Sequence, residues 1–245
     1  MQHLLRRKIT HIVISILFCP FVGQAQYKEL NLPDHDDKPF HFDIAIGFNR
    51  SHFSFTHHPQ FFAYANSDSV MSVESINSSG ISLGLPYVKH LNEHFSLRTN
   101  IFNLIFTQKA FEYRLKYPDR PIGEDSITMK KVESVSVSFP LQVKFMSDRI
   151  DNFRVYMFGG GKAEYDFQAN AGKKNADNLI KLKRWDIGVE AGLGFHFYMP
   201  MVVLIPELKI GWGLSNLHSR NSNLKYSNVI DKINSRTITF SLMIE

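Results

Sequence analysis

The segment from residue 134 to residue 145 alternates strictly between apolar side chains and small or polar ones. One face carries Val135, Val137, Phe139, Leu141, Val143 and Phe145, and the other carries Ser134, Ser136, Ser138, Gln142 and Lys144. A period of two places successive side chains on opposite faces of a β-strand, whereas a helix requires a period of 3.6. The segment therefore predicts a strand with one apolar and one polar face, and the fold must satisfy both.

The same alternation recurs along the chain and predicts eight strands in total. We expect them over residues 40–49, 80–90, 95–106, 134–145, 153–167, 184–198, 204–214 and 237–244. The third strand has mixed faces, with Leu97, Thr99 and Ile101 opposite Arg98, Asn100 and Phe102, so the pattern does not fix its register.

Short and long connections alternate between these predicted strands. The short ones lie near Asn92, at 147–152 and at 199–200, and the long polar ones near 50–79, 107–131, 168–182 and 215–235. This alternation is typical of an outer-membrane barrel of antiparallel strands. It predicts an all-β, eight-stranded transmembrane β-barrel with both termini on the short-turn, periplasmic side of a Gram-negative outer membrane.

The composition of the polar face favours this barrel over a secreted β-sandwich or a soluble lipocalin-like barrel. A sandwich buries its apolar face, whereas a barrel in lipid encloses its polar face. Here the polar face is rich in glycine, serine and charges of both signs, namely Asp43, Lys144, Arg154, Glu164, Glu190, Glu207 and Lys209. We expect a charge network in the lumen, formed by Lys144, Arg154, Glu190, Glu207 and Lys209.

The lumen of an eight-stranded barrel is narrow enough for side chains to fill it. The sequence therefore predicts a structural network rather than an open pore. A proton or substrate path along the same charges is the alternative, because charges within a membrane often serve transport.

Large aromatic residues lie where the strands should leave the bilayer. Trp185 and Trp212 are near the long-loop side, and Tyr87, Phe197 and Tyr198 are near the short-turn side. Two such bands resemble the aromatic girdles of outer-membrane barrels.

The first 25 residues have the features of a secretory signal peptide. Three basic residues precede an apolar stretch, and small residues lead to a predicted cleavage between Ala25 and Gln26. Residues 26–39 then form a short periplasmic lead-in, and residues 40–245 form the barrel. The single cysteine, Cys19, lies in the leader, which excludes disulfides and thiolate sites from the mature chain.

The leader also contributes three units of the +5 formal net charge, which leaves +2 for the mature chain. No basic stripe remains to indicate a nucleic-acid partner.

Four short motifs suggest chemistry, but each has a simpler explanation. Asp34–Asp37 lacks the pattern of a calcium loop and is expected to be a solvated polar segment. Gly159–Lys162 lacks the spacing of a phosphate loop and lies within a strand, where glycine permits close packing. His52 and Ser54, and the pair His57-His58, are expected in a loop. We therefore expect no catalytic, cofactor-binding or metal-binding residues and no small-molecule substrate.

Several stretches resemble the PorT family of small outer-membrane barrels tied to type IX protein secretion. They are NLPDHDDKPFHFDIAIGFN (31–49), SFPLQVKF (138–145), VYMFGGGKAEYDF (155–167), DIGVEAGLGFHFY (186–198) and IPELKIGWGLSNL (205–217). The resemblance covers about residues 31–245, and the last motif is the most specific.

This resemblance implies a non-enzymatic role in the export and surface attachment of proteins with C-terminal sorting domains. Its implied partners are outer-membrane lipid and other type IX secretion components, and it carries over no catalytic residue. One alternative is a lipid A-modifying barrel hydrolase that uses His52 and Ser54. Another is a small structural or porin-like outer-membrane barrel.

Overall fold

The computed structural model describes residues 29–35, 38–62, 70–118, 125–169, 181–220 and 225–245. The chain divides into Met1–Leu30 and Asn31–Glu245, and the second unit holds every element named below. These elements are η1 (Pro33–His35), β1 (Phe40–Phe42), β2 (Ile44–His57), β3 (Val70–Ile76), β4 (Ser78–His90), β5 (Phe95–Leu115), β6 (Ile127–Met146), β7 (Phe153–Asp166), β8 (Trp185–Tyr198), β9 (Val203–Gly213), α3 (Lys225–Asn228) and β10 (Ile230–Ile244). Among the described residues, no helix has the length and apolar character needed to cross a membrane.

Eight of the strands form a closed antiparallel ring. The order is β2, β4, β5, β6, β7, β8, β9 and β10, and β10 pairs with β2 to close it. That closing seam is long, from Ile244 opposite Ile44 to Ile230 opposite His57. The prediction of an eight-stranded antiparallel barrel is confirmed.

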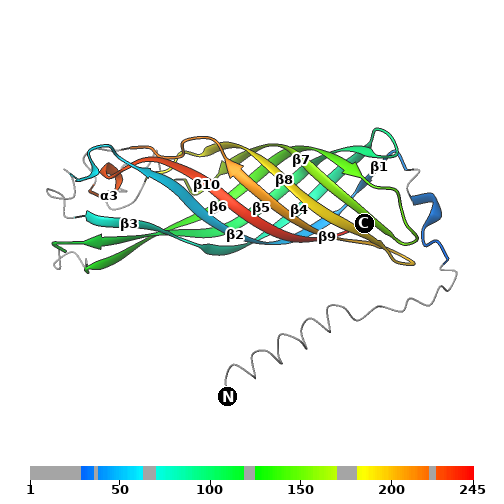
Figure 1. Ribbon diagram of the computed structural model, residues 1–245, viewed down its shortest axis with the longest axis horizontal. Helices are drawn as coiled ribbons and strands as arrows, with labels where there is room; N and C mark the ends of the chain where they lie inside the picture. The colour runs from blue at the N-terminus through cyan, green and yellow to red at the C-terminus, as the bar shows by residue number, and fades with distance from the viewer. Residues whose placement is uncertain (1–28, 36–37, 63–69, 119–124, 170–180, 221–224) are drawn as a thin grey trace, which may run out of the picture. The chain divides into compact units, whose positions relative to one another are not determined.

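The two remaining strands extend this ring at its ends. β1 pairs with β4, and β3 pairs with the far half of β5. Figure 1 shows β3 and α3 at one end of the barrel and β1 at the other. We call the first the loop end, and the second the turn end because the short β6–β7 and β8–β9 connections lie there.

Side chains alternate across the barrel wall as the period of two requires. On the outside, Leu141, Ile187 and Leu208 are 59%, 62% and 43% exposed, whereas Lys144 and Glu207 are 0% and 3% exposed on the inside. Exposed aliphatic rows of this extent suit a wall in contact with lipid. A water-surrounded sandwich with these residues in its centre is excluded.

The strands are longer than predicted, mainly toward the loop end. β2 continues to His57, β10 begins at Ile230, and β5 and β6 remain paired out to Arg114 opposite Ile127. Large parts of the expected loops at 50–79 and 107–131, and the last six residues of the one at 215–235, are therefore strand.

The faces of these longer strands exchange their character part-way along. In β2, the outward series Ile46 and Phe48 gives way to Arg50, while the inward series Asn49 and Ser51 gives way to buried Phe53. The same change occurs in β10, where outward Phe240 and Ile238 are followed by Arg236 and Lys232, and inward Thr239 and Ser235 by buried Ile233. In β2 and β10 the wall is therefore apolar outside over the turn-end half and polar outside over the loop-end half, whereas Met71, Ile127 and Met129 are exposed apolar residues in the loop-end parts of β3 and β6. Only the first half is suited to lipid.

The mixed faces of the third predicted strand have a local cause. The pairing of β5 with β6 breaks register between Thr99 and Leu104, and its pairing with β4 breaks between Leu85 and Pro86. Ile101 and Phe102 are adjacent yet both exposed, at 54% and 41%. A bulge inserts an extra residue and reverses which side chains face inward. Arg98 faces the lumen before the bulge and Asn103 after it.

Apolar side chains fill both ends of the barrel interior. The loop-end cluster comprises Phe53, Val70, Val73, Phe111, Tyr113, Leu115, Leu182, Leu217, Tyr226, Val229, Ile230 and Ile233. The turn-end cluster comprises Met146, Tyr156, Phe158, Tyr198, Val203, Ile205 and Met243. Polar side chains occupy the lumen between these two clusters.

Candidate functional site in the barrel lumen

The centre of the polar lumen is an ion pair between Arg98 and Glu207. Arg98 Nη1 donates to Glu207 Oε2 at 2.5 Å, and both side chains are 3% exposed. The Tyr156 hydroxyl donates to the same oxygen at 2.6 Å. Arg98 Nε donates to Gln142 Oε1 at 2.5 Å, and its guanidinium lies 4.3 Å from the centre of the Phe158 ring. Each charge therefore has an opposite charge and polar partners, which a buried pair requires.

Glu190 extends this network toward the loop end. The Gln142 amide donates to Glu190 Oε1, so Gln142 bridges Arg98 and Glu190. Lys209 Nζ lies 3.4 Å from Glu190 Oε2. Three of the five residues predicted to form the network, Glu190, Glu207 and Lys209, thus lie in one connected group.

The other two predicted members lie closer to the turn end. Lys144 is fully buried, and its ammonium group lies 4.2 Å from the centre of the Tyr156 ring. Arg154 donates from Nε to the carbonyl oxygen of Ser147 at 2.8 Å and from Nη2 to that of Glu93 at 3.4 Å. Arg154 therefore binds the backbone of the turns.

A second group of charges lies nearer the loop end. Lys162 Nζ donates to Glu164 Oε2 at 2.8 Å, and the Ser136 hydroxyl donates to Glu164 Oε1 at 2.7 Å. Lys109 Nζ donates to Ser235 Oγ at 3.1 Å and lies 4.7 Å from the centre of the Phe53 ring, at the boundary with the loop-end cluster.

Glycines on the lumen face make room for the large side chains of neighbouring strands. A Cβ atom on Gly194 would lie 2.4 Å from the Tyr156 ring, and one on Gly192 would lie 2.6 Å from the Phe158 ring. In the Gly159–Gly161 run, only Gly160 is crowded, since its Cβ would lie 2.1 Å from the carbonyl oxygen of Leu141. Gly159 and Gly161 face outward with nothing closer than 3.9 Å, so the expected close packing applies to Gly160 alone.

The space left between the lumen side chains is small. One cavity of about 30 Å³ is lined by residues that include Ser82, Lys162 and Glu190, and another of about 30 Å³ lies beside Arg98 and Glu207. A third, of about 20 Å³, lies under the loop-end cluster. Volumes of this size hold single water molecules. The lumen as described is a packed interior.

The aromatic residues form bands at both edges of the apolar wall, with one correction. Trp185 is 57% exposed and its ring lies 5.0 Å from that of Tyr165, and Trp212 is 39% exposed on the same side. At the turn end, the rings of Tyr87 and Phe42 lie 5.2 Å apart on the outside. The prediction was wrong for Tyr198, which is 3% exposed and faces the lumen. Neighbours in a strand face opposite ways, so Phe197 and Tyr198 cannot both meet lipid.

His52 and Ser54 do not lie in a loop, as expected, but in β2. Both are on its outer face in the loop-end half, opposite Arg236 and Asn234 of β10. A serine nucleophile needs a base within hydrogen-bond reach and an acid that orients the base. Within the part of the chain that the structure describes, no hydrogen bond joins His52 to Ser54 or either one to a carboxylate. His57 is also a strand residue, the last of β2.

The lead-in before the barrel is partly folded, and this also differs from expectation. His35, expected to be solvated with its acidic neighbours, is 9% exposed and lies 2.7 Å from Glu245. The Asn31 backbone N–H donates to Asn152 Oδ1 at 2.8 Å. The lead-in therefore packs on the turn end. The predicted signal peptide and its cleavage between Ala25 and Gln26 lie outside the described residues.

A family model for an outer membrane protein β-barrel domain matches residues 24–219. The chain belongs to this family. This family indicates a location in the outer membrane of a Gram-negative bacterium. The exposed apolar wall of the barrel is suited to that membrane. A search of curated proteins finds no significant match.

The chain is similar to several solved outer-membrane barrels, all at low sequence identity. Neisserial surface protein A is 10% identical with a TM-score of 0.43, over 84% of this chain and 99% of that one. OprG of Pseudomonas aeruginosa is 11% identical with a TM-score of 0.41, over 82% and 92%. Ail of Yersinia pestis, in complex with a heparin analogue, is 12% identical with a TM-score of 0.37, over 83% and 96%.

Sequence reasoning missed several residues that complete the lumen network. Arg98 was not among the predicted lumen residues, because the register of its strand was undecided. Tyr156 was not among them either, because the residues around it do not alternate between polar and apolar. A signal for Tyr156 was present, since Gly194 lies opposite it in β8 and leaves room for a ring. Only the cross-strand register shows that these positions meet.

Proposed function

We propose that this barrel is a non-enzymatic outer-membrane component that works by contact with other proteins, with its termini in the periplasm and its loop end outside the cell. The observation that supports this most is the packed lumen, in which the Arg98–Glu207 pair and its partners occupy the space that a solute would need. A lumen filled in this way leaves the wall and the ends of the barrel available for function.

The loop-end half supplies a rigid surface for such contacts. Its strands enclose the loop-end cluster, and their outer faces mix polar residues such as Arg236 and Lys131 with the exposed apolar residues Ile127 and Met129. β5 and β6 extend furthest, and β3 adds a third strand to them. The extended strands, rather than loops, carry the proposed protein-binding surface beyond the bilayer.

The finer proposal is a role in type IX secretion, in the export and surface attachment of cargo with C-terminal sorting domains. It rests on the resemblance to the PorT family. The most specific motif of that resemblance, IPELKIGWGLSNL, runs along β9 and supplies Glu207 and Lys209 to the lumen and Leu217 to the loop-end cluster. The motif thus combines residues of the barrel interior with Leu208 and Trp212 on its outer wall, which supports a shared architecture.

Deletion of the gene tests the secretion role. We expect sorting-domain cargo to accumulate in the periplasm and to be absent from the cell surface, and the full chain supplied in trans to restore export. Normal cargo export in the deletion strain would reject the role in type IX secretion while leaving the barrel itself unaffected.

Site-specific crosslinking tests the contact surface. A photoreactive residue placed at Arg236 or Glu112, on the outer face of the loop-end half, should capture protein of the secretion apparatus in intact cells. The same residue at Leu141 on the apolar wall serves as the matched control and should capture mainly lipid. Equal protein capture at both positions would contradict a contact surface confined to the loop end.

The hydrolase alternative is tested separately. Ser54→Ala should leave the mass spectrum of lipid A unchanged, because no carboxylate orients His52 within the described residues. A shift in lipid A mass that depends on Ser54 would support the enzyme instead.

A further inference from the structure

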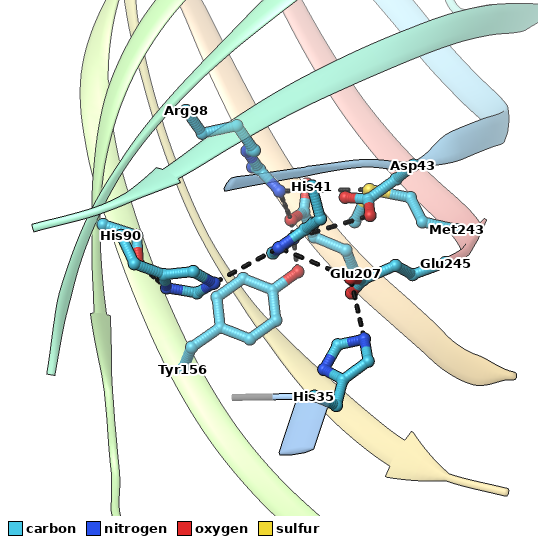
Figure 2. Close-up of polar contacts among 10 residues, drawn as sticks. His35, His41, Asp43, His90, Arg98, Tyr156, Glu207, Met243 and Glu245 are labelled. Carbon is cyan, nitrogen blue, oxygen red and sulfur yellow. Dashed lines mark hydrogen bonds and ion pairs between the residues drawn. The ribbon is translucent and has the colours of Figure 1, made fainter. Parts of the chain in front are cut away.

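Four ionisable side chains from separate segments meet at the turn end of the barrel. His35 comes from η1, His41 from β1, Asp43 from the residue between β1 and β2, and Glu245 from the residue after β10. Figure 2 shows His41 between Asp43 and Glu245, with His35 approaching Glu245 from the other side. The seam that closes the barrel and the lead-in segment thus converge on one point.

These groups are buried and close together. His41, Asp43 and Glu245 side chains are 5%, 0% and 7% exposed. His41 Nε2 lies 3.6 Å from Asp43 Oδ1, His41 Nδ1 lies 3.4 Å from Glu245 Oε1, and His35 Nε2 lies 2.7 Å from the same Glu245 oxygen. One ligand atom from each of His41, Asp43 and Glu245 lies within 4.8 Å of the other two.

Most of the polar atoms in this group lack a hydrogen bond. His41 Nε2, both carboxylate oxygens of Asp43 and Glu245 Oε2 are buried with no hydrogen-bond partner among the described residues, and Glu245 Oε1 has only its ionic contacts with His35 and His41. A buried carboxylate without partners is costly, since it loses hydration and gains nothing in return. Two such carboxylates facing one imidazole call for a positive charge between them.

A relay of hydrogen bonds behind His41 orients its ring. His41 Nδ1 lies 3.2 Å from His90 Nε2, and His90 Nδ1 lies 2.8 Å from Ser96 Oγ. When His41 donates to His90 and His90 donates to Ser96, the lone pair of His41 Nε2 points toward Asp43. A metal-binding histidine characteristically donates its other ring N–H in this way, which fixes its tautomer and orientation.

We propose that His41, Asp43 and Glu245 bind a divalent transition-metal ion of the Zn²⁺ class at the turn end. His35 holds the Glu245 carboxylate in place through its 2.7 Å contact. Imidazole nitrogen together with carboxylate oxygen is a donor set that Zn²⁺ accepts, at bond lengths near 2.0–2.2 Å. A tetrahedral ion with such bonds separates its ligands by about 3.3 Å. His41 Nε2 lies 3.6 Å from Asp43 Oδ1, and the ligand atoms of all three residues lie within 4.8 Å of one another.

The charges around the group permit a cation. Asp43 and Glu245 face it directly, and Lys144, whose ammonium group lies over the Tyr156 ring, exerts the largest Coulombic effect on Asp43. Arg98 is paired with Glu207. A divalent ion would add counter-charge to the two buried carboxylates, and it would join η1, β1 and β10 at the seam.

Metal titration of the full chain tests this proposal. The protein, purified without a histidine tag, folded in detergent micelles and treated with chelator, should bind one Zn²⁺ per chain by calorimetry and elemental analysis. Its thermal unfolding temperature should rise on addition of Zn²⁺ alone, because a ligand that binds only the folded state stabilises it. Co²⁺ in the same site should give visible absorption bands that the Zn²⁺ form lacks.

Matched variants separate this site from nonspecific binding. Asp43→Asn and His41→Gln should abolish the stoichiometric binding, and His35→Gln should weaken it by about 10- to 100-fold. His94→Gln is the control, since His94 lies at the same end but is 40% exposed and pairs with Asp148. If Asp43→Asn fails to fold by circular dichroism, Glu245→Gln at the strand end replaces it. Absence of bound Zn²⁺ in the wild-type chain, or binding that survives these substitutions, would show a charge cluster without an ion and overturn the proposal.

Discussion

The charged side chains at the centre of the lumen, Arg98 and Glu207, each meet specific partners. Arg98 contacts Glu207, Gln142 and the Phe158 ring. Glu207 also accepts a hydrogen bond from the Tyr156 hydroxyl. A buried ion pair adds little net stability, but removal of one member leaves an uncompensated charge. At this scale the lumen is a set of mutually dependent groups, and single substitutions should have large effects.

Arg98→Met tests this dependence. The variant leaves Glu207 buried without its cation, and we expect the free energy of unfolding to fall by about 3–5 kcal/mol. Urea titration in detergent or lipid vesicles measures the change. Arg114→Met is the control, because Arg114 is 57% exposed and lies 3.7 Å from Glu112, and exposed pairs contribute less than about 1 kcal/mol. Equal effects of the two substitutions would contradict the role assigned to the buried pair.

Two adjacent glycines provide a second test at single residues. Gly160→Ala places a Cβ 2.1 Å from the Leu141 carbonyl oxygen, whereas Gly159→Ala meets nothing closer than 3.9 Å. We expect Gly160→Ala to cost about 1–3 kcal/mol through overpacking, and Gly159→Ala to be neutral or stabilising by up to about 1 kcal/mol. The same urea titration compares them, and a larger loss in Gly159→Ala would show that the faces are assigned wrongly.

The strands themselves have two halves of opposite character. In β6, the outer face changes from Lys131 and Glu133 in the loop-end half to Phe139 and Leu141 in the lipid-facing half. A strand in lipid must be apolar outside, and a strand in water must be apolar inside. β2 and β10 satisfy both conditions by exchanging their faces part-way along. The loop-end part of β6 does so only partly, since Ile127 and Met129 stay exposed outside and Lys130 lies over the buried Tyr226 ring.

Two substitutions in β6 test which part of the strand lies in lipid. Leu141→Lys introduces a charge near the middle of the lipid-facing wall and should cost about 2–4 kcal/mol. Lys131→Gln, on the same strand outside the lipid region, should change stability by less than about 0.5 kcal/mol. Both are measured by folding into vesicles, and a small effect of Leu141→Lys would argue against a wall in lipid.

The segment between β9 and α3 should respond to pH. His218 Nε2 lies 2.9 Å from Ser227 Oγ, and burial lowers the pKa of His218 below its ordinary value of 6.5. The folded segment favours the neutral ring, so protonation favours opening, and its stability falls as pH decreases through 6.5. Amide hydrogen exchange over residues 225–233, corrected for intrinsic rates, should show less protection at pH 5 than at pH 7.5. The His218→Gln variant should lose this pH dependence. If the variant keeps the pH dependence, a titratable group other than His218 is responsible for it.

The period of two was sufficient to predict the strands and the inside and outside of the lipid-facing half, but it failed where the faces exchange. Polar outward residues such as Arg50, His52 and Ser54 resemble a loop when they are read without the inward Phe53 between them. The cluster of His35, His41, Asp43 and Glu245 could not be predicted, because residues 35 and 245 meet only when the ring closes. The local sequence pattern indicates which face of a strand a residue occupies. The closure of the barrel and the register between strands determine which other residues it contacts.

For the whole molecule, the packed lumen predicts a barrel that does not conduct. The cavities described above measure only about 20–30 Å³ each, and Arg98, Glu207 and Gln142 line the one nearest the turn end. Planar-bilayer recordings of the folded protein should therefore show no steady conductance above the bilayer background. Steady, reproducible single-channel steps would favour the porin-like alternative.

In the proposed arrangement, the outer face of the barrel changes from lipid-facing to water-facing between Phe48 and Arg50 of β2. A cysteine scan of this strand tests the change most directly, because Cys19 in the predicted leader is the chain's only natural cysteine. In intact outer membranes, cysteines at positions 44, 46 and 48 should resist a water-soluble maleimide, and those at 50, 52 and 54 should react. Uniform reaction along the strand, or reaction at 44–48 alone, would contradict the proposed arrangement.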